Sequence, residues 1–446
     1  MSDAADLTRG PALRRIVGFA LPLTAANLLQ QGYLLVDSVV VGHYVGIGGL
    51  AAIGACGPLF YLLNAMFIGL GTAFTIRLAH LRGARQDGER RGVVLALALV
   101  TVVWSVGCVL PATLLSGPVL GLMGIHGQLA ADCARFLGIL AIGFPGIFGT
   151  AAVSAYLRGL GDSRAAMWVQ GIGSLLNVAL VLLFVAVLEW GIGGAAAATA
   201  AASTAALLVG LGWAARTHPS TRGESVPEVR RELVDAVRLG FPLASQHIIL
   251  AVGIMVLVWI IQAYGEVVMA AFTIVSRLEL FTGMLFLDFS GGVTAFVAQN
   301  LGGADRERAR RGLVDTMALT LGLSVVVAGV VLLARAPIAA LFTDDLATRA
   351  LTERYIVIIY PFLALYTVMV VAHGYLNGAR RTAVPLVCTV IAFVLVQIPF
   401  AYLFSGVFGI TAVMWAVVAG WTAGLTYSLF CLRRVLFPSR VPVGVS

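Results

Sequence analysis

The chain has 446 residues, of which 60% are apolar and only 11% are charged, and its formal net charge is +8. A typical soluble domain has about 25% charged residues. The composition therefore excludes a water-soluble globular protein and indicates one that is embedded in a membrane.

Apolar stretches long enough to cross a bilayer core of about 30 Å recur along the whole chain. The first six lie at 13–44, 49–79, 91–115, 134–157, 165–188 and 192–215. The second six lie at 235–262, 268–299, 312–334, 353–377, 383–404 and 409–432. Backbone amides in hydrocarbon must be bonded within their own segment, and no alternating strand pattern is present. We therefore expect an all-α integral membrane protein with twelve transmembrane helices.

The second half of the sequence repeats the first at an offset of about 220 residues. Thr72-Ala73-Phe74 returns as Thr294-Ala295-Phe296, and Arg90-Arg91-Gly92 returns as Arg310-Arg311-Gly312. Six spans per copy, an even number, make the two copies parallel. We predict an N-terminal lobe at 1–215, a cytoplasmic linker at 216–234 and a C-terminal lobe at 235–446.

Basic residues predict the orientation in the membrane. All 29 are arginines, and most lie at the two termini or beside the loops that follow even-numbered spans. The positive-inside bias predicts that both termini lie in the cytoplasm. We expect a multi-pass protein of the plasma (inner) membrane. We attribute the positive charge to this topology and to contact with the lipid bilayer, and we expect no nucleic-acid partner.

Span 1 carries the foremost polar group, Asp37, which lies inside an apolar segment. At about 100° per residue, Gln30 and Tyr33 fall on the same helix face as Asp37, with Asn27 beside them. A buried carboxylate is costly, and it readily takes up a proton or a small cation. The stripe predicts a site for a coupling ion, H+ or Na+; the alternative is a carboxylate that only accepts hydrogen bonds from its neighbours.

Span 8 carries three charged residues, Arg277, Glu279 and Asp288. Arg277 could pair with Glu279 or with Asp37, and a structural ion pair is the alternative to a transport role. His247 and His373 could relay protons or form hydrogen bonds between helices. The five cysteines have no paired spacing, so we expect no metal centre and no cofactor.

Several segments resemble multidrug and toxic compound extrusion (MATE) transporters. They are 36–42 with 50–54, 156–164 and its downstream Asn177, 276–279, and 297–302. The resemblance covers essentially the whole chain, and it is closer to the DinF-like subgroup than to the sodium-coupled NorM-like members.

The resemblance implies two six-helix bundles around a V-shaped cleft that expels small organic, often cationic, molecules in exchange for protons or sodium ions. It places Asp37 on the acidic position of span 1, and Asn177 and Thr199 on polar positions that assist it. Sodium-coupled relatives often carry acids on spans 7 and 10, where this chain has Leu250 and Tyr366. Coupling through Asp37, with protons favoured over sodium, is therefore expected.

We expect protonation of Asp37 to rearrange span 1 near Pro22 and to release substrate outward. Aromatic and thioether side chains suit varied cations, and the predicted substrate contacts are Tyr33, Tyr61, Met66, Met255, Met284 and Phe286. One alternative is a flippase for a lipid-linked precursor, which would need a basic cleft. Another is a membrane enzyme, but the sequence offers no cluster of histidines and carboxylates, so we predict no catalytic residues. A monomer is sufficient for the expected cleft.

Overall fold

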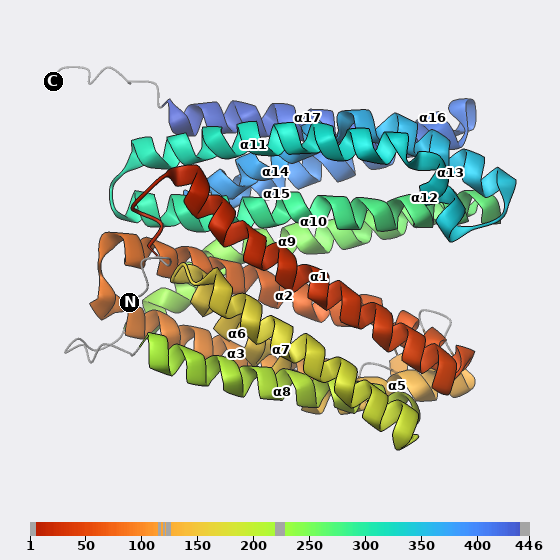
Figure 1. The fold of residues 1–446 in the computed structure, drawn as a ribbon, viewed down its shortest axis with the longest axis horizontal. Coiled ribbons are helices and arrows are strands. Elements are labelled where there is room, and N and C mark those ends of the chain that lie inside the picture. The colour runs from red at the N-terminus through yellow and green to blue at the C-terminus, as the bar shows by residue number, and fades with distance from the viewer. Residues whose placement is uncertain (1–5, 115–116, 119–120, 122–125, 219–227, 438–446) are drawn as a thin grey trace. The chain divides into compact units, whose positions relative to one another are not determined.

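The computed structural model describes residues 6–114, 117–118, 121, 126–218 and 228–437. Within these ranges the regular elements are all helices, and Figure 1 shows them as long rods. Eleven helices are long and apolar enough to cross a membrane, and one pair bent by 54° gives up to twelve spans. The expected all-α membrane fold is confirmed.

Helices of the first sequence copy match the predicted spans closely. They are α1 (Ala12–Tyr44), α2 (Ile47–Ala84), the short η2 (Asp87–Glu89), α3 (Arg90–Leu114), α5 (Gly127–Ile142), α6 (Phe144–Gly159), α7 (Ser163–Val181), the π-helical η3 (Leu182–Val187) and α8 (Gly191–Thr217). The fourth span is the bent pair, because the chain breaks at Gly143 just before Pro145.

Helices of the second copy follow the same plan. They are α9 (Val229–Gln262), α10 (Glu266–Gly302), α11 (Arg306–Leu333), α12 (Arg335–Phe342), α13 (Leu346–Ile359), η4 (Tyr360–Phe362), α14 (Leu363–Gly378), α15 (Ala383–Thr389), η5 (Val390–Gln397), α16 (Ile398–Phe408) and α17 (Ile410–Leu436). A π-helical segment, η5, lies within the eleventh span, and another, η3, forms the end of the fifth. The fifth span of each copy therefore contains a π-helical segment.

Two compact units divide the chain, and each contains the start of a helix from the other copy. The N-terminal unit includes Gly18–Ala244, so residues 229–244 of α9 pack with it. The lobe boundaries at 215 and 235 stay a prediction. The C-terminal unit includes Ser245 onward and Arg9–Val17, the start of α1. Most of the predicted linker, 219–227, lies outside the described residues.

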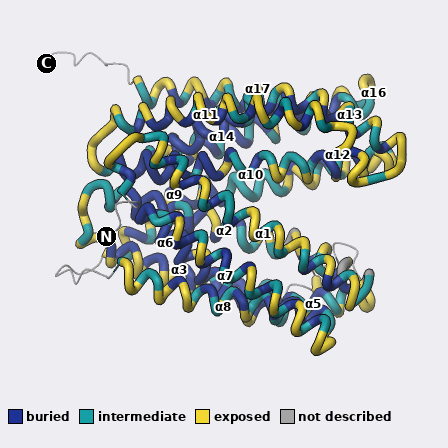
Figure 2. The backbone as a smooth tube through the Cα atoms, in the orientation of Figure 1, coloured by how far each residue is buried: buried dark blue, intermediate teal, exposed yellow. Residues whose placement is uncertain are grey.

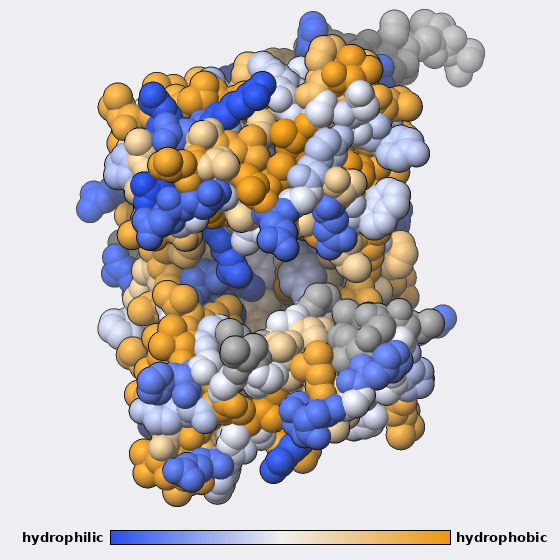
Figure 3. Space-filling view, turned by 90° about the vertical axis from the view of Figure 1, so that its right-hand side faces the viewer, coloured by the Kyte–Doolittle hydropathy of each residue, from blue (hydrophilic) through white to orange (hydrophobic). Residues whose placement is uncertain are grey.

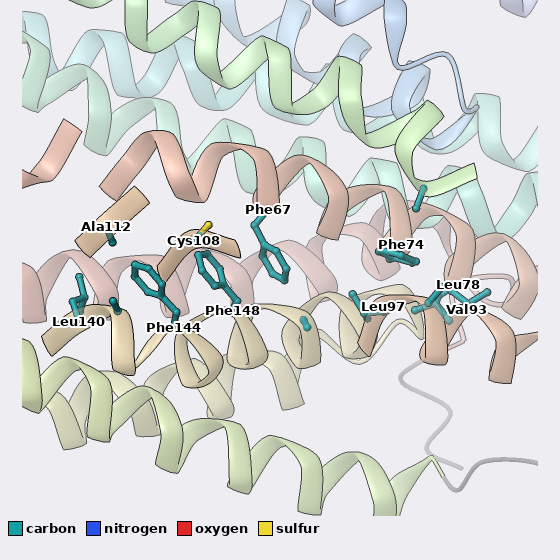
Figure 4. Packing of buried hydrophobic residues seen from close by; sticks show 14 of the residues in the cluster. Phe67, Phe74, Leu78, Val93, Leu97, Cys108, Ala112, Leu140, Phe144 and Phe148 are labelled. Atoms are coloured by element: carbon teal, nitrogen blue, oxygen red, sulfur yellow. The ribbon is translucent and has the colours of Figure 1, made fainter. Parts of the chain in front are cut away.

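Aromatic side chains fill the core of the N-terminal unit. Phe67 of α2 contacts Phe148 of α6 with ring centroids 4.9 Å apart, and Phe148 contacts Phe144 at 5.4 Å (Figure 4). Figure 2 shows that α8, α11 and α17 expose much of their outer surface. Many of those exposed side chains are apolar, such as Leu208 and Val325. Apolar outer surfaces are suited to contact with lipid.

Helix ends carry the polar groups that the spans lack. At the start of α13, Asp345 accepts hydrogen bonds from the backbone N–H and hydroxyl of Thr348. Nearby, Arg349 pairs with Asp344 at 2.7 Å. Figure 3 looks onto an end of the helices and shows hydrophilic side chains (blue) among apolar ones. This distribution fits helix ends that meet water and head groups.

Candidate functional site

Asp37 occupies a buried position on α1. It is 9% exposed, and its Oδ1 atom has no hydrogen-bond partner among the described residues. One turn further along α1, Val40 and Val41 belong to an apolar cluster with side chains of three following elements. Those side chains are Val181 of α7, Val185 of η3, and Ala195 and Ala198 of α8. The cluster fixes the position of α1 beside Asp37.

Asn177 and Thr199 join α7 to α8 through one hydrogen bond. The Asn177 Nδ2 atom donates to Thr199 Oγ1 at 3.2 Å, and that hydroxyl donates to the Ala195 carbonyl at 3.1 Å. The Asn177 Oδ1 atom is buried without a hydrogen-bond partner, and so is Ser174 Oγ, one turn earlier on α7. Buried oxygens of this kind ordinarily have a partner, so they mark a place for a proton donor or a cation.

The apolar cluster places these groups at one level of the N-terminal unit. Asp37 lies one turn before Val41, Asn177 lies one turn before Val181, and Thr199 is next to Ala198. Because all three neighbours meet in the same cluster, we expect the three polar side chains to lie near its edge. The structure brings Asn177 and Thr199 together on α7 and α8, and their joint action with Asp37 in coupling stays a prediction.

A small polar cavity of about 50 Å³ lies among α1, α6, α7 and α8. Its lining includes Tyr33, Ser174, Asn177 and Thr199. Tyr33 interacts electrostatically with Asp37 and hydrogen-bonds the Gln30 side chain. The space is sufficient for at least one water or a small ion.

The donor set of this cavity consists of oxygens. The lining itself offers neutral oxygens and no acid, and the Asp37 carboxylate interacts electrostatically with Tyr33 of that lining. One carboxylate and several neutral oxygens can hold a proton or a hard cation such as sodium. No group of three or more His, Cys, Asp or Glu side chains that would bind a metal occurs in the part of the chain that is described. Sequence analysis missed Ser174, although its spacing of three residues from Asn177 places both on one face of α7.

Glu279 is the centre of a second polar cluster, in the C-terminal unit. Its Oε1 atom is buried without a hydrogen-bond partner, and it interacts electrostatically with Tyr355, Tyr360 and Tyr366. The Tyr360 hydroxyl lies 3.3 Å from that of Thr282 on α10. No local pattern predicts this tyrosine cluster, because the three tyrosines come from α13, η4 and α14.

The pairing of Arg277 with Glu279, one of the two alternatives from the sequence, is not among the ion pairs of the described residues. Two residues apart on a helix, their side chains point in directions that differ by about 160°. Arg277 is exposed, whereas Glu279 points toward the buried tyrosines. Pairing of Arg277 with Asp37, which belongs to the other unit, stays a prediction.

The other predicted contacts are distributed over both units. Asp288 is buried, His247 and Met284 are half-buried, and Tyr61 and Met255 are exposed. Phe286 is fully buried in a core cluster, so its prediction as a substrate contact is wrong. His373 has its Nε2 atom 2.9 Å from the Ser428 hydroxyl, which confirms a hydrogen bond between helices.

A buried ion pair that the sequence analysis did not consider holds the start of α9. The Arg77 Nε and Nη2 atoms donate to the two carboxylate oxygens of Glu232 at 2.9 and 2.8 Å. Arg77 also donates to Glu89 at 2.8 Å. Arg77 and Glu232 are 9% and 5% exposed. This bidentate pair fastens α9 to α2 within the N-terminal unit.

Comparisons with known proteins agree with this architecture. The MatE family model matches residues 22–183 and again 242–403. The probable multidrug resistance protein YoeA of Bacillus subtilis is 24% identical over 404 residues, which cover 87% of this chain and 86% of the relative. The multidrug resistance protein PmpM of Pseudomonas aeruginosa is 28% identical over 419 residues, with coverages of 90% and 86%. A crystal structure of MATE in the bent conformation has a TM-score of 0.91 at 22% identity, covering 98% of each chain. This chain belongs to the MatE family and is a transporter, not an enzyme.

Proposed function

We propose that this protein exports small organic, often cationic, compounds in exchange for a coupling ion, and that protons are preferred over sodium. The observation that carries the proposal is the buried Asp37 carboxylate beside the polar cavity of α1, α7 and α8. Relatives named as multidrug resistance proteins support this class of substrate. The alternative of a lipid-linked cargo has no such support among them.

In this mechanism Asp37 gives up and takes up the coupling proton. A proton on Asp37 removes the buried charge and turns one carboxylate oxygen into a donor, which can satisfy an oxygen such as Asn177 Oδ1. Pro22 interrupts the hydrogen bonding of α1. A change at Asp37 can therefore bend α1 at that point and alternate the access of the substrate.

The proposed preference for protons over sodium rests on the number of acidic side chains at the site. A sodium site is favoured by several oxygen ligands with a second negative charge. Here the position four residues after Asn177 is Val181, and the cavity lining has no acid. A single carboxylate with neutral partners is sufficient for a proton. On this ground we place the chain nearer the DinF-like than the NorM-like members.

The second polar cluster is proposed to bind substrate or a further ion in the C-terminal unit. Its carboxylate is Glu279, whose tyrosine cluster offers hydroxyl donors and aromatic faces to a cation. Arg277, Asp288, His247, Met255 and Met284 of the same unit, and Tyr61 of the other, are the remaining proposed contacts. The transporter is proposed to act as a monomer in the plasma membrane with both termini in the cytoplasm.

Efflux from liposomes tests the proposal. A fluorescent organic cation is loaded, and a proton gradient or a sodium gradient is imposed separately. We expect the proton gradient to drive transport by the native protein, Asp37→Asn to abolish it, and Asp132→Asn, a change at an acid of α5 in the same unit, to leave it intact. Glu279→Gln in the same assay tests the second cluster.

Full activity of the Asp37→Asn protein would overturn the coupling role of Asp37. Transport driven by sodium alone would overturn the preference for protons. If neither gradient moved any cation, the exporter proposal would fall, and lipid-linked cargo would become the next candidate.

A further inference from the structure

A long apolar groove runs along the outside of the N-terminal unit, separate from the Asp37 cavity. It has a volume of about 480 Å³, and its walls are α3 and α8 while α6 forms the floor. The floor consists of small residues such as Gly149 and Ala152. Val102 and Val106 on its rim are 60% and 64% exposed. The groove exists because small side chains on α6 leave space between two larger helices.

The length of the groove matches one leaflet of a bilayer. Its lining extends from Val94 to Val106 on α3 and from Pro145 to Tyr156 on α6. At 1.5 Å per residue these stretches span about 16 to 18 Å, close to half of the bilayer core of about 30 Å. At roughly 30 Å³ per methylene, about the share of one water in the liquid, the volume fits an acyl chain of about 16 carbons.

Charged groups gather at one end of the groove, whereas the Thr101 and Ser105 hydroxyls of its lining donate to carbonyls of their own helix, α3. At the charged end the Tyr156 hydroxyl donates to the His218 carbonyl at 3.4 Å, and the His218 Nε2 atom lies 3.6 Å from Asp162. Arg82, Arg90 and Asp87 lie close enough to interact electrostatically with Tyr156. This end is where α3 begins and where α6 and α8 finish, which places it at the boundary between hydrocarbon and head groups.

Charge at this end favours an anion. Arg90 is partly neutralised by Asp87 at 3.5 Å, and Asp162 is opposed by Arg164. Arg82 adds a further positive charge, and it is half-buried at the last turn of α2. A basic end is suited to a phosphate, and the Tyr156 hydroxyl at this end can donate to that phosphate in place of the His218 carbonyl, 3.4 Å away.

We propose that this groove binds one anionic phospholipid, with an acyl chain along α6 and the phosphate between Tyr156 and Arg82. The inference does not depend on what the protein transports. It differs from general solvation by lipid because the groove selects the head group as well as the tail.

Native mass spectrometry tests this proposal. The full-length protein is purified in an equal mixture of phosphatidylglycerol and phosphatidylethanolamine with identical acyl chains. We expect the native protein to retain one phosphatidylglycerol in preference to phosphatidylethanolamine. Arg82→Gln should reduce that preference about fivefold, the equivalent of about 1 kcal/mol for one basic residue at an anionic surface.

Ala98→Phe places a ring in the groove from the exposed wall of α3 and should abolish selective retention. The matched control is Ala318→Phe, since Ala318 is the exposed residue at the same distance from Arg-Arg-Gly in the second copy. Arg433→Gln, an exposed change on α17, is the control for charge. Each variant is first checked for a single elution peak.

Equal retention of the two lipids by the native protein would overturn the proposal. So would an Ala98→Phe protein that retains phosphatidylglycerol as well as the Ala318→Phe control does. Binding of the transported cation in the groove, with release of the lipid, would assign the groove to substrate instead.

Discussion

The buried pair of Arg77 and Glu232 predicts unequal effects of removing its two members. Glu232 has only Arg77 as an ionic partner in the described structure, so Arg77→Met leaves a buried, uncompensated carboxylate. Breaking a buried pair in this way costs about 3 to 5 kcal/mol. Glu232→Gln is milder, because Arg77 keeps Glu89, whose side chain is 44% exposed. We expect a cost of about 1 to 3 kcal/mol, that of a hydrogen bond to a charged group.

Thermal unfolding in detergent measures both effects. At about 2 to 4 °C per kcal/mol, the midpoint for Arg77→Met should fall by about 6 to 20 °C. The double variant Arg77→Met with Glu232→Leu should recover much of that loss, since it leaves no buried charge. Arg91→Met, at an exposed arginine two residues after Glu89, serves as the control. Equal destabilisation by the two single changes, or a double variant as unstable as Arg77→Met, would refute the reasoning.

Two further predictions concern packing and pH. A Cβ at Gly374 would lie 2.5 Å from the Ser290 carbonyl oxygen, so Gly374→Ala should lower the free energy of unfolding by about 1 to 3 kcal/mol. Gly322 has open space around it, so Gly322→Ala should be neutral or stabilising by up to about 1 kcal/mol. A thermal midpoint for Gly374→Ala at or above that of Gly322→Ala would contradict this prediction. Asp162 caps α7 by accepting the N–H three residues on at 3.0 Å, so Asp162→Ala should cost about 1 kcal/mol at neutral pH. Burial acts to raise the pKa of Asp162, but the His218 hydrogen bond and the helix N–H lower it overall. Its stabilisation is therefore present above the ordinary aspartate pKa and is lost as pH falls through the lower folded value; a native-to-variant difference in midpoint that does not shrink on acidification would count against this cap.

The sequence alone determined the membrane class, the spans and the repeat. Hydrocarbon excludes unbonded backbone groups, so any crossing segment must be a long apolar helix, and that constraint is local. The predicted first span, 13–44, corresponds to α1 at Ala12–Tyr44, and the predicted third, 91–115, to α3 at Arg90–Leu114. A charge inside such a segment is conspicuous for the same reason, which is why Asp37 could be singled out.

Only the tertiary structure decided which groups surround each charge. Arg77 and Glu232 are 155 residues apart, and the sequence around either residue does not predict that the two form an ion pair. The tyrosines around Glu279 likewise come from elements distant in sequence, and the two residues nearest in the chain, Arg277 and Glu279, proved to point apart. A helical pattern fixes which face a side chain occupies, but the helix that covers that face is chosen by packing across the whole unit.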